Sequence, residues 1–442
     1  MDRKGRKIFV NFASVKEKLY KEILELLHRE VKPALGCTEP IAAALAVARA
    51  AAEFPDLVVT GLEVKVSPNI LKNAMGVGIP GTGLTGLPVA CALAVVCGDW
   101  TLGLEVLRGV NDEAVARAKR MVAEGKVSVG LSDSDEMLYV EAICKFEGGH
   151  ESVCILEEAH DRISFVSRDG QVVIDDRPEK SDTSDSPKAD FLTLALIDEF
   201  ARTADLADLG LMREEIAMNT ALSEEGMRGR YGLCVGRTIA DSCNQDVFGS
   251  NLSAVCMAMT AAASDARMAG CALPAMSNSG SGNQGLTVSL PVIAAARHLG
   301  SSEEQLIRAL TLSNLVAIHI KSYLGKLSAL CGCVVASTGS SCGIIMLRGG
   351  DTGQMASAIK NMIGSITGMV CDGAKEGCAM KVASGVSCAI QSAVLALDGI
   401  CVQPTDGIID QDVENTIRNL GAIGSCGMKQ TDKMILDIMV RK

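Results

Sequence analysis

The chain has 442 residues, of which 48% are hydrophobic and only 3% aromatic, and it contains 44 glycines and 17 cysteines. This length exceeds the size at which a single hydrophobic core stops growing, so two domains are expected. The net charge of −11 has the wrong sign for binding a phosphate backbone, which argues against a nucleic-acid partner.

Neither a membrane span nor an export signal is expected from the sequence. The best apolar run, 84–97, is too short for a transmembrane helix and is followed by Asp99. The charged N-terminus lacks the apolar stretch of a signal peptide. We therefore expect a cytoplasmic protein in a reducing compartment, whose cysteines are thiols, thiolates or metal ligands rather than disulfides.

The N-terminal part of the chain mixes helical and strand patterns. Apolar residues with helical spacing predict a helix over about 14–29, and a second helix follows over about 38–52. Alternating residues predict a strand over 62–66. Residues 139–174 alternate in the same way and are broken by glycine-containing turns, which is typical of antiparallel hairpins.

The composition changes abruptly after this hairpin region. Residues 180–187 contain no apolar side chain, which is typical of a linker, and the chain beyond them is a series of Ala-, Ser- and Gly-rich helical segments. We therefore predict an α+β fold. It has an N-terminal α/β domain on an antiparallel sheet (1–178), a linker (179–190) and a C-terminal all-helical domain (191–442).

The segment 36–40, Gly-Cys-Thr-Glu-Pro, places Cys37 at a predicted helix start. The positive end of the helix dipole stabilises a thiolate and lowers its pKa, so Cys37 could act as a base or nucleophile near neutral pH. The alternative is an ordinary helix cap whose cysteine only packs. The residues alone do not decide between these two interpretations.

Further cysteines lie in the C-terminal half: Cys331, Cys333, Cys342, Cys371 and Cys378. Gly373 and Gly377 suggest a turn that could bring two of these thiols together. Three or four thiolates would satisfy an iron–sulfur centre, although the spacing is neither a standard ferredoxin pattern nor a zinc site. The alternative is a set of scattered core cysteines, with Cys342 in a turn rich in Gly and Ser.

The segment 277–285 has no apolar side chain within a hydrophobic domain. The exposed backbone N–H groups of such a turn can hold a carboxylate or a phosphate. The alternative is a plain connection between helices. A second polar segment, 69–73, favours a plain turn.

Several of these segments together resemble a known family. Residues 36–40, 327–332 and 370–375, with the loop around Asn278, resemble L-cysteine desulfidase and its bacterial relatives. They resemble more distantly the α-chain domain of iron–sulfur L-serine dehydratase. The similarity extends from Cys37 to Asp432.

The resemblance implies a 4Fe–4S cluster held by Cys331, Cys371 and Cys378, with one iron open to substrate. Cys333 could replace Cys331 as a ligand. The resemblance also implies that Cys37 is the base that removes the substrate α-proton. From its donors, we expect the polar loop to bind the substrate carboxylate through Ser277, Asn278, Ser279, Gly280, Ser281 and Asn283.

The predicted function is therefore an iron–sulfur-dependent β-elimination by a carbon–sulfur lyase. It converts L-cysteine to sulfide, ammonia and pyruvate, with L-serine as the open alternative, and a homo-oligomer is expected. A pyridoxal-phosphate eliminase is a second reading, because residues 281–285 resemble the substrate loop of those enzymes. The nearest preceding lysine, Lys188, lies in the predicted linker, which argues against it. A third reading is a non-catalytic, thiol-rich metal-binding protein.

Overall fold

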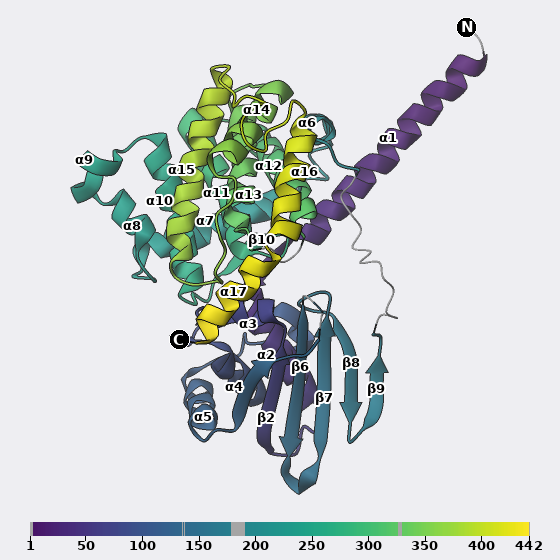
Figure 1. The fold of residues 1–442 in the computed structure, drawn as a ribbon, viewed down its shortest axis with the longest axis vertical. Helices are drawn as coiled ribbons and strands as arrows, with labels where there is room; N and C mark the ends of the chain where they lie inside the picture. The colour runs from purple at the N-terminus through teal and green to yellow at the C-terminus, as the bar shows by residue number, and fades with distance from the viewer. Residues whose placement is uncertain (1–2, 135, 137, 178–190, 326–328, 442) are drawn as a thin grey trace.

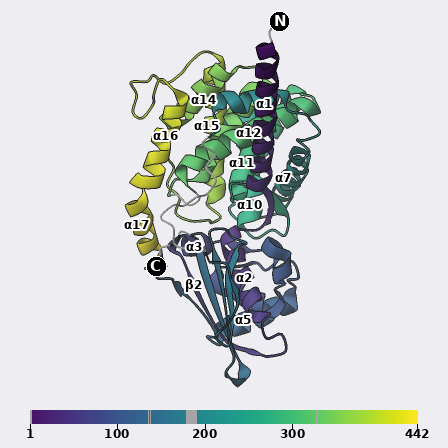
Figure 2. The ribbon, with the colours of Figure 1, turned by 90° about the vertical axis from the view of Figure 1, so that its right-hand side faces the viewer.

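The structure is a computed structural model that describes residues 3–134, 136, 138–177, 191–325 and 329–441. A region built on a sheet carries a larger region made of helices (Figures 1 and 2). The predicted fold class is confirmed, with the sheet in the N-terminal part and the helices in the C-terminal part. The predicted linker, 179–190, lies outside the described residues.

The sheet has six strands in the order β5-β2-β6-β7-β8-β9. Only the β2–β5 pair is parallel, and the other pairs are antiparallel. Buried and partly exposed residues alternate along β6, so one face of the sheet packs on the helices α2 and α4, and α5 packs on α4. The elements of this region are β2 (Val59–Val66), β5 (Val127–Leu131), β6 (Tyr139–Phe146), β7 (Glu151–Glu157), β8 (Ile163–Arg168), β9 (Gln171–Asp175), α2 (Thr38–Ala51), α3 (Pro68–Ala74), α4 (Leu87–Cys97), α5 (Asp112–Ala123) and the short hairpin of β3 (Gly78–Ile79) and β4 (Leu84–Thr85).

The helical region is built around buried helices composed largely of small residues. α11 and α13 are buried along most of their length, and both contact α12. The helices are α6 (Leu194–Thr203), α7 (Leu211–Arg228), α8 (Val235–Ala240), α9 (Gln245–Phe248), α10 (Leu252–Met268), α11 (Gly282–Leu299), α12 (Glu303–Leu324), α13 (Gly332–Leu347), α14 (Thr352–Ser365), α15 (Cys378–Leu397), α16 (Val413–Ala422) and α17 (Lys429–Val440).

The N-terminal segment packs with the helical region and not with the sheet. The first helix, α1 (Arg3–Glu30), is longer than predicted and buries Ile23 and Leu27 in the same core as α11 and α12. The strand β1 (Val31–Leu35) then pairs antiparallel with β10 (Pro274–Asn278). This two-stranded ribbon leads the chain directly from the helical core to the start of α2.

Close contact between α7 and α10 depends on a missing side chain. A Cβ atom built on Gly226 would lie 1.9 Å from the carbonyl oxygen of Ala262, so alanine would force the two helix backbones apart. We expect Gly226→Ala to lower the free energy of unfolding by roughly 2 kcal/mol or more, measured as a lower thermal midpoint. Gly130→Ala, in β5 with no atom within 4 Å of the new Cβ, is the control. Equal midpoints for the two variants would contradict this packing.

Among the described helices, α15 alone has the length and hydropathy to cross a bilayer. No membrane span is predicted there from the sequence. Half of its apolar window is buried against other parts of the chain, as in the core helix of a globular protein.

Candidate metal and active site

Three of the predicted site cysteines lie at helix N-termini. Cys37 precedes the first residue of α2, Cys331 precedes α13, and Cys378 is the first residue of α15. Ser281 caps α11, whose first turn belongs to the predicted substrate segment. Each of these ends carries the positive end of a helix dipole.

Side chains of α10 and α11 join these helix ends. The Arg267 guanidinium donates to the Gly36 carbonyl oxygen at 2.9 Å and to Asn283 Oδ1 at 3.3 Å, which links the starts of α2 and α11. The Gln284 carboxamide lies against the start of α13, because a Cβ atom on Gly332 would lie 2.6 Å from its Oε1. The starts of α2, α11 and α13 therefore lie around one site, and Cys378 at the start of α15 packs against the cluster that contains Cys37.

A short backbone ladder joins the segments of Cys331 and Cys371. The Cys331 N–H donates to Met369 O and the Cys371 N–H donates to Ala329 O, both at 2.7 Å. This pairing places the two thiols in hydrogen-bonding contact. Residues 327 and 328, which begin one of the motifs that carry the resemblance, lie outside the described residues.

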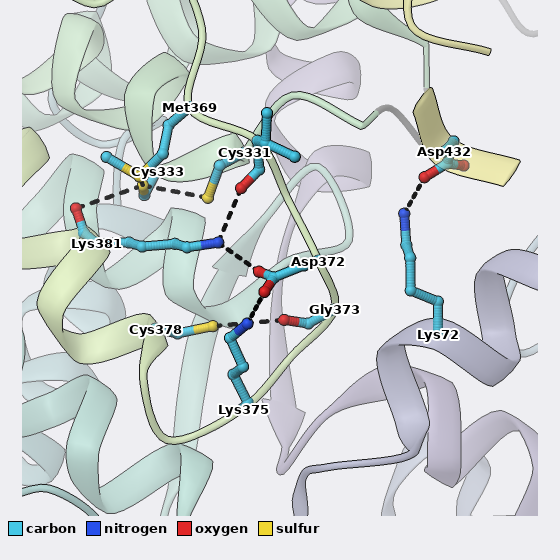
Figure 3. A network of polar contacts seen from close by, with 11 residues as sticks. Lys72, Cys331, Cys333, Met369, Asp372, Gly373, Lys375, Cys378, Lys381 and Asp432 are labelled. Carbon is cyan, nitrogen blue, oxygen red and sulfur yellow. Dashed lines mark hydrogen bonds and ion pairs between the residues drawn. The ribbon is translucent and has the colours of Figure 1, made fainter. Parts of the chain in front are cut away.

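A turn brings Cys378 to the same site, as the sequence predicted. Helix α15 begins only at Cys378, and Gly373 has a φ of +93°. A Cβ atom on Gly373 would lie 2.2 Å from the Lys72 carbonyl oxygen, so only glycine allows this approach. Lys381 Nζ holds the turn by donating to Asp372 Oδ1 at 2.6 Å (Figure 3).

The remaining predicted cysteines differ in their surroundings. Cys37 packs with Met268, and Cys378 contacts the same small cluster. Cys333 Sγ lies 3.2 Å from Cys331 Sγ, also in Figure 3. The prediction that Cys342 lies in a turn is wrong. Cys342 is fully buried in the middle of α13, because the apolar residues around it continue that helix into the core.

Lysine side chains surround the thiols. Burial lowers the pKa of Lys321 to about 8, against the attraction of Cys371 and Cys331. Lys72 is 2% exposed and forms an ion pair with Asp432 of α17 (Figure 3). Buried ammonium groups require nearby anions, and thiolates at Cys331 and Cys371 would supply them.

The donor set fits an iron–sulfur cluster better than a single metal ion. Within the described ranges, no three His, Cys, Asp or Glu side chains are placed to hold one ion. In a cluster each thiolate binds a different iron, so the sulfurs need not converge on one point. The contact with Cys333 raises the pKa of Cys331, and burial raises that of Cys378, so the thiols are neutral until a cation binds them. Three thiols from separate segments, with basic side chains around them, match this chemistry.

A family model described as the serine dehydratase alpha chain matches residues 101–437. The chain belongs to the serine dehydratase alpha-chain family. Membership implies an enzyme of the dehydratase or ammonia-lyase type, and the family is generally iron–sulfur dependent. The matched range contains Cys331, Cys371 and Cys378, but not Cys37.

Relatives resemble the chain over almost its whole length. A UPF0597 protein of Oleidesulfovibrio alaskensis is 47% identical over 422 residues, which cover 95% of this chain and 97% of the relative. A UPF0597 protein of Bacteroides thetaiotaomicron is 46% identical, with 96% and 98% covered. A UPF0597 protein of Shewanella pealeana is 44% identical, with 97% and 100% covered. These names specify no substrate.

Cys37 lies at a helix start, as predicted. The prediction that its pKa is lowered is wrong. Burial raises the pKa of Cys37 to about 12 and outweighs the attraction of Arg267. The side chain is 2% exposed, and desolvation disfavours a thiolate more than the dipole favours it. In the described conformation, Cys37 is therefore a thiol.

The predicted substrate loop is mostly regular structure. Ser277 and Asn278 end β10, Gly282 and Asn283 begin α11, and only the residues between them form a turn. The side chains bond inside the protein: Ser277 Oγ to Lys32 O (2.6 Å), Asn278 Nδ2 to Asn314 Oδ1 (2.8 Å), Ser279 Oγ to Asn278 Oδ1 (2.9 Å), Gln284 N to Ser281 Oγ (3.3 Å), and Thr38 Oγ1 to Gly280 O (3.3 Å). What this segment offers a ligand is therefore the first turn of α11, whose N–H groups lack intrahelical acceptors.

Four site residues were not predicted from the sequence: Lys72, Arg267, Gln284 and Lys321. Arg267 ends a helix of small apolar residues, which is an unusual place for a buried charge and the one signal available. A surface cavity of about 640 Å³ lies elsewhere between α7, α11 and α12 and is lined by none of the cysteines.

Glu215 in α7 gives the helical region a pH-dependent stability. Burial raises its pKa from 4.5 to about 8, so the folded chain keeps a proton that the unfolded chain has lost between these values. The free energy of unfolding therefore falls as pH rises through this window. We expect Glu215→Gln to lose less thermal stability than wild type between about pH 5 and pH 8. If the melting points of wild type and Glu215→Gln changed equally with pH over this range, the raised pKa of Glu215 would be contradicted.

Proposed function

We propose that this chain is an iron–sulfur-dependent lyase that removes the β-substituent of a small α-amino acid. The proposed substrate is L-cysteine and the products are sulfide, ammonia and pyruvate. The convergence of Cys331, Cys371 and Cys378 on one basic site, with Cys37 beside it, supports this proposal. The family relationship supports the dehydratase type of chemistry.

Cys331, Cys371 and Cys378 would hold the cluster as thiolates. Bound there, the cluster supplies a Lewis acid that stabilises the charge developing on the leaving group. Lys72 and Lys321 offset the negative charge of the thiolates and keep the site close to neutral. The backbone ladder between residues 329–331 and 369–371 fixes the spacing of two of the ligands.

Cys37 is the proposed base. Its thiolate would be stabilised by the Arg267 guanidinium and by the start of α2. A base with a raised pKa is a strong acceptor once deprotonated, which suits a weakly acidic α-proton. Cys37 takes this proton, and the Cα electron pair forms the Cα–Cβ double bond as the C–S bond breaks and hydrosulfide leaves. The resulting enamine tautomerises to an imine, and water hydrolyses the imine to pyruvate and ammonia.

The surroundings favour a thiol substrate over a hydroxyl. Met268 packs with Cys37, and Met369 Sδ lies 3.9 Å from Cys333 Sγ. Thioether and thiol groups contact a substrate sulfur well, which supports L-cysteine as the proposed substrate. L-serine remains the second candidate because the matching family is described as serine dehydratase.

Anaerobically purified protein, incubated separately with L-cysteine and L-serine, tests this function. Pyruvate and ammonia should form in equal amounts, together with equal sulfide from L-cysteine, and turnover should stop when iron is chelated. Iron binding without turnover on either substrate would favour the non-catalytic metal-binding reading. Inactivation by borohydride with a trapped lysine would favour pyridoxal-phosphate chemistry.

A further inference from the structure

Two buried polar atoms of opposite kind lack partners near the first turn of α11. Arg267 is 4% exposed and its Nε donor has no hydrogen-bond acceptor. Gln284 is 1% exposed and its Oε1 acceptor has no donor. Buried polar groups are nearly always paired, so an unmatched donor and an unmatched acceptor beside the same helix turn indicate a missing ligand.

Arg267 carries a buried positive charge without a carboxylate partner among the described residues. Its hydrogen bonds reach the Gly36 carbonyl, the Asn283 amide and the Cys37 thiol. The backbone of Gly282 packs directly on the guanidinium, since a Cβ atom there would lie 2.2 Å from Nε. A buried guanidinium is costly unless an anion binds it, and a carboxylate matches its planar fork. Cys37 is in contact with the same guanidinium.

A chain of amides fixes the orientation of Gln284. Asn314 Nδ2 donates to Glu215 Oε2 at 2.8 Å and to the Leu310 carbonyl at 3.0 Å, so Asn314 Oδ1 must be its acceptor end. Asn278 Nδ2 donates to that oxygen at 2.8 Å. Gln284 Nε2 donates in turn to Asn278 Oδ1 at 2.8 Å. The Gln284 oxygen is therefore left as an acceptor directed at the start of α13, beside Cys331.

We propose that Arg267 and Gln284 recognise the two charged groups of an α-amino acid, with Arg267 binding the carboxylate and the Gln284 oxygen accepting from the ammonium. This assignment rests on the proposed function. It places Cα beside Cys37, because the carboxylate carbon is bonded directly to Cα and the Arg267 guanidinium contacts Cys37. The ammonium lies toward Cys331, which leaves the β-substituent free to reach the three ligand cysteines.

Ligands without a leaving group test this assignment independently of turnover. L-alanine carries both charged groups, and propionate carries the carboxylate alone. Binding is measured by the ligand-dependent rise in thermal midpoint and, where turnover occurs, by inhibition of the L-cysteine reaction. The variants are Arg267→Lys and Gln284→Met. Arg237→Lys, at an arginine that donates to the backbone carbonyls of Arg228 and Gly229, and the exposed Gln391→Met are the matched controls.

We expect Arg267→Lys to weaken both ligands about tenfold or more, because a lysine cannot bind the carboxylate with a planar fork. Gln284→Met should weaken L-alanine by about the same factor and leave propionate unchanged, so that the preference for the amino acid disappears. Iron content should stay at the wild-type level in all variants. Wild-type L-alanine binding by Gln284→Met would overturn the ammonium contact, and wild-type propionate binding by Arg267→Lys would overturn the carboxylate contact. Absence of turnover on any amino acid, with these binding changes observed, would overturn the proposed function alone.

Discussion

Replacing Cys37 with alanine should lower kcat for L-cysteine at least about 100-fold while the iron content stays unchanged. A positioned general base contributes about 10²- to 10⁴-fold to the rate, and its loss removes that contribution. Steady-state kinetics and iron analysis on the same anaerobic preparation measure both quantities.

Cys91→Ala is the matched control for this variant, because Cys91 is equally buried in the α4 helix of the sheet region. It should retain wild-type kcat. Full activity in Cys37→Ala would remove the base assignment. Loss of iron in Cys37→Ala, but not in Cys91→Ala, would instead make Cys37 a ligand.

The second large effect distinguishes Cys331 from Cys333 as a ligand. We expect Cys331→Ser to lose the cluster, because this residue contacts Cys371 and lies at the helix start with its positive dipole. Cys333→Ser should keep the cluster, since its sulfur is directed at Met369 and at the Lys381 carbonyl. Visible absorbance and iron content of anaerobically purified variants measure the outcome.

Cys342→Ser, in the interior of α13, serves as the control for a buried thiol lost from the same helix. It should keep its iron. If Cys333→Ser loses iron and Cys331→Ser retains it, Cys333 is the ligand in place of Cys331, which is the alternative given from the sequence.

Local signals made several features predictable from the sequence. Alternating residues predicted the hairpins of β6 to β9, and the Gly-Cys-Thr-Glu-Pro segment predicted a cysteine at a helix start. Gly373 and Gly377 predicted the turn that places Cys378 at the site. Each of these features depends on residues close together in the chain.

Features that depend on distant residues were not predictable from a single sequence. The pairing of β1 with β10 joins segments about 240 residues apart, and no local pattern marks it. The low pKa expected for Cys37 failed because its burial depends on Met268 and Val77, which lie far away in the chain. The polar segment 69–73 predicted a plain turn, but it forms part of α3, and the Lys72 side chain is buried and paired with Asp432 of α17.

The amounts of iron and acid-labile sulfide in anaerobically purified, reconstituted wild-type protein test the central assignment most directly. Cys331, Cys371 and Cys378 together are expected to retain about four iron and four sulfide per chain, and to resist alkylation while they do so. Iron retained without sulfide, or these three thiols alkylated as readily with iron as without it, would contradict a cluster at this site.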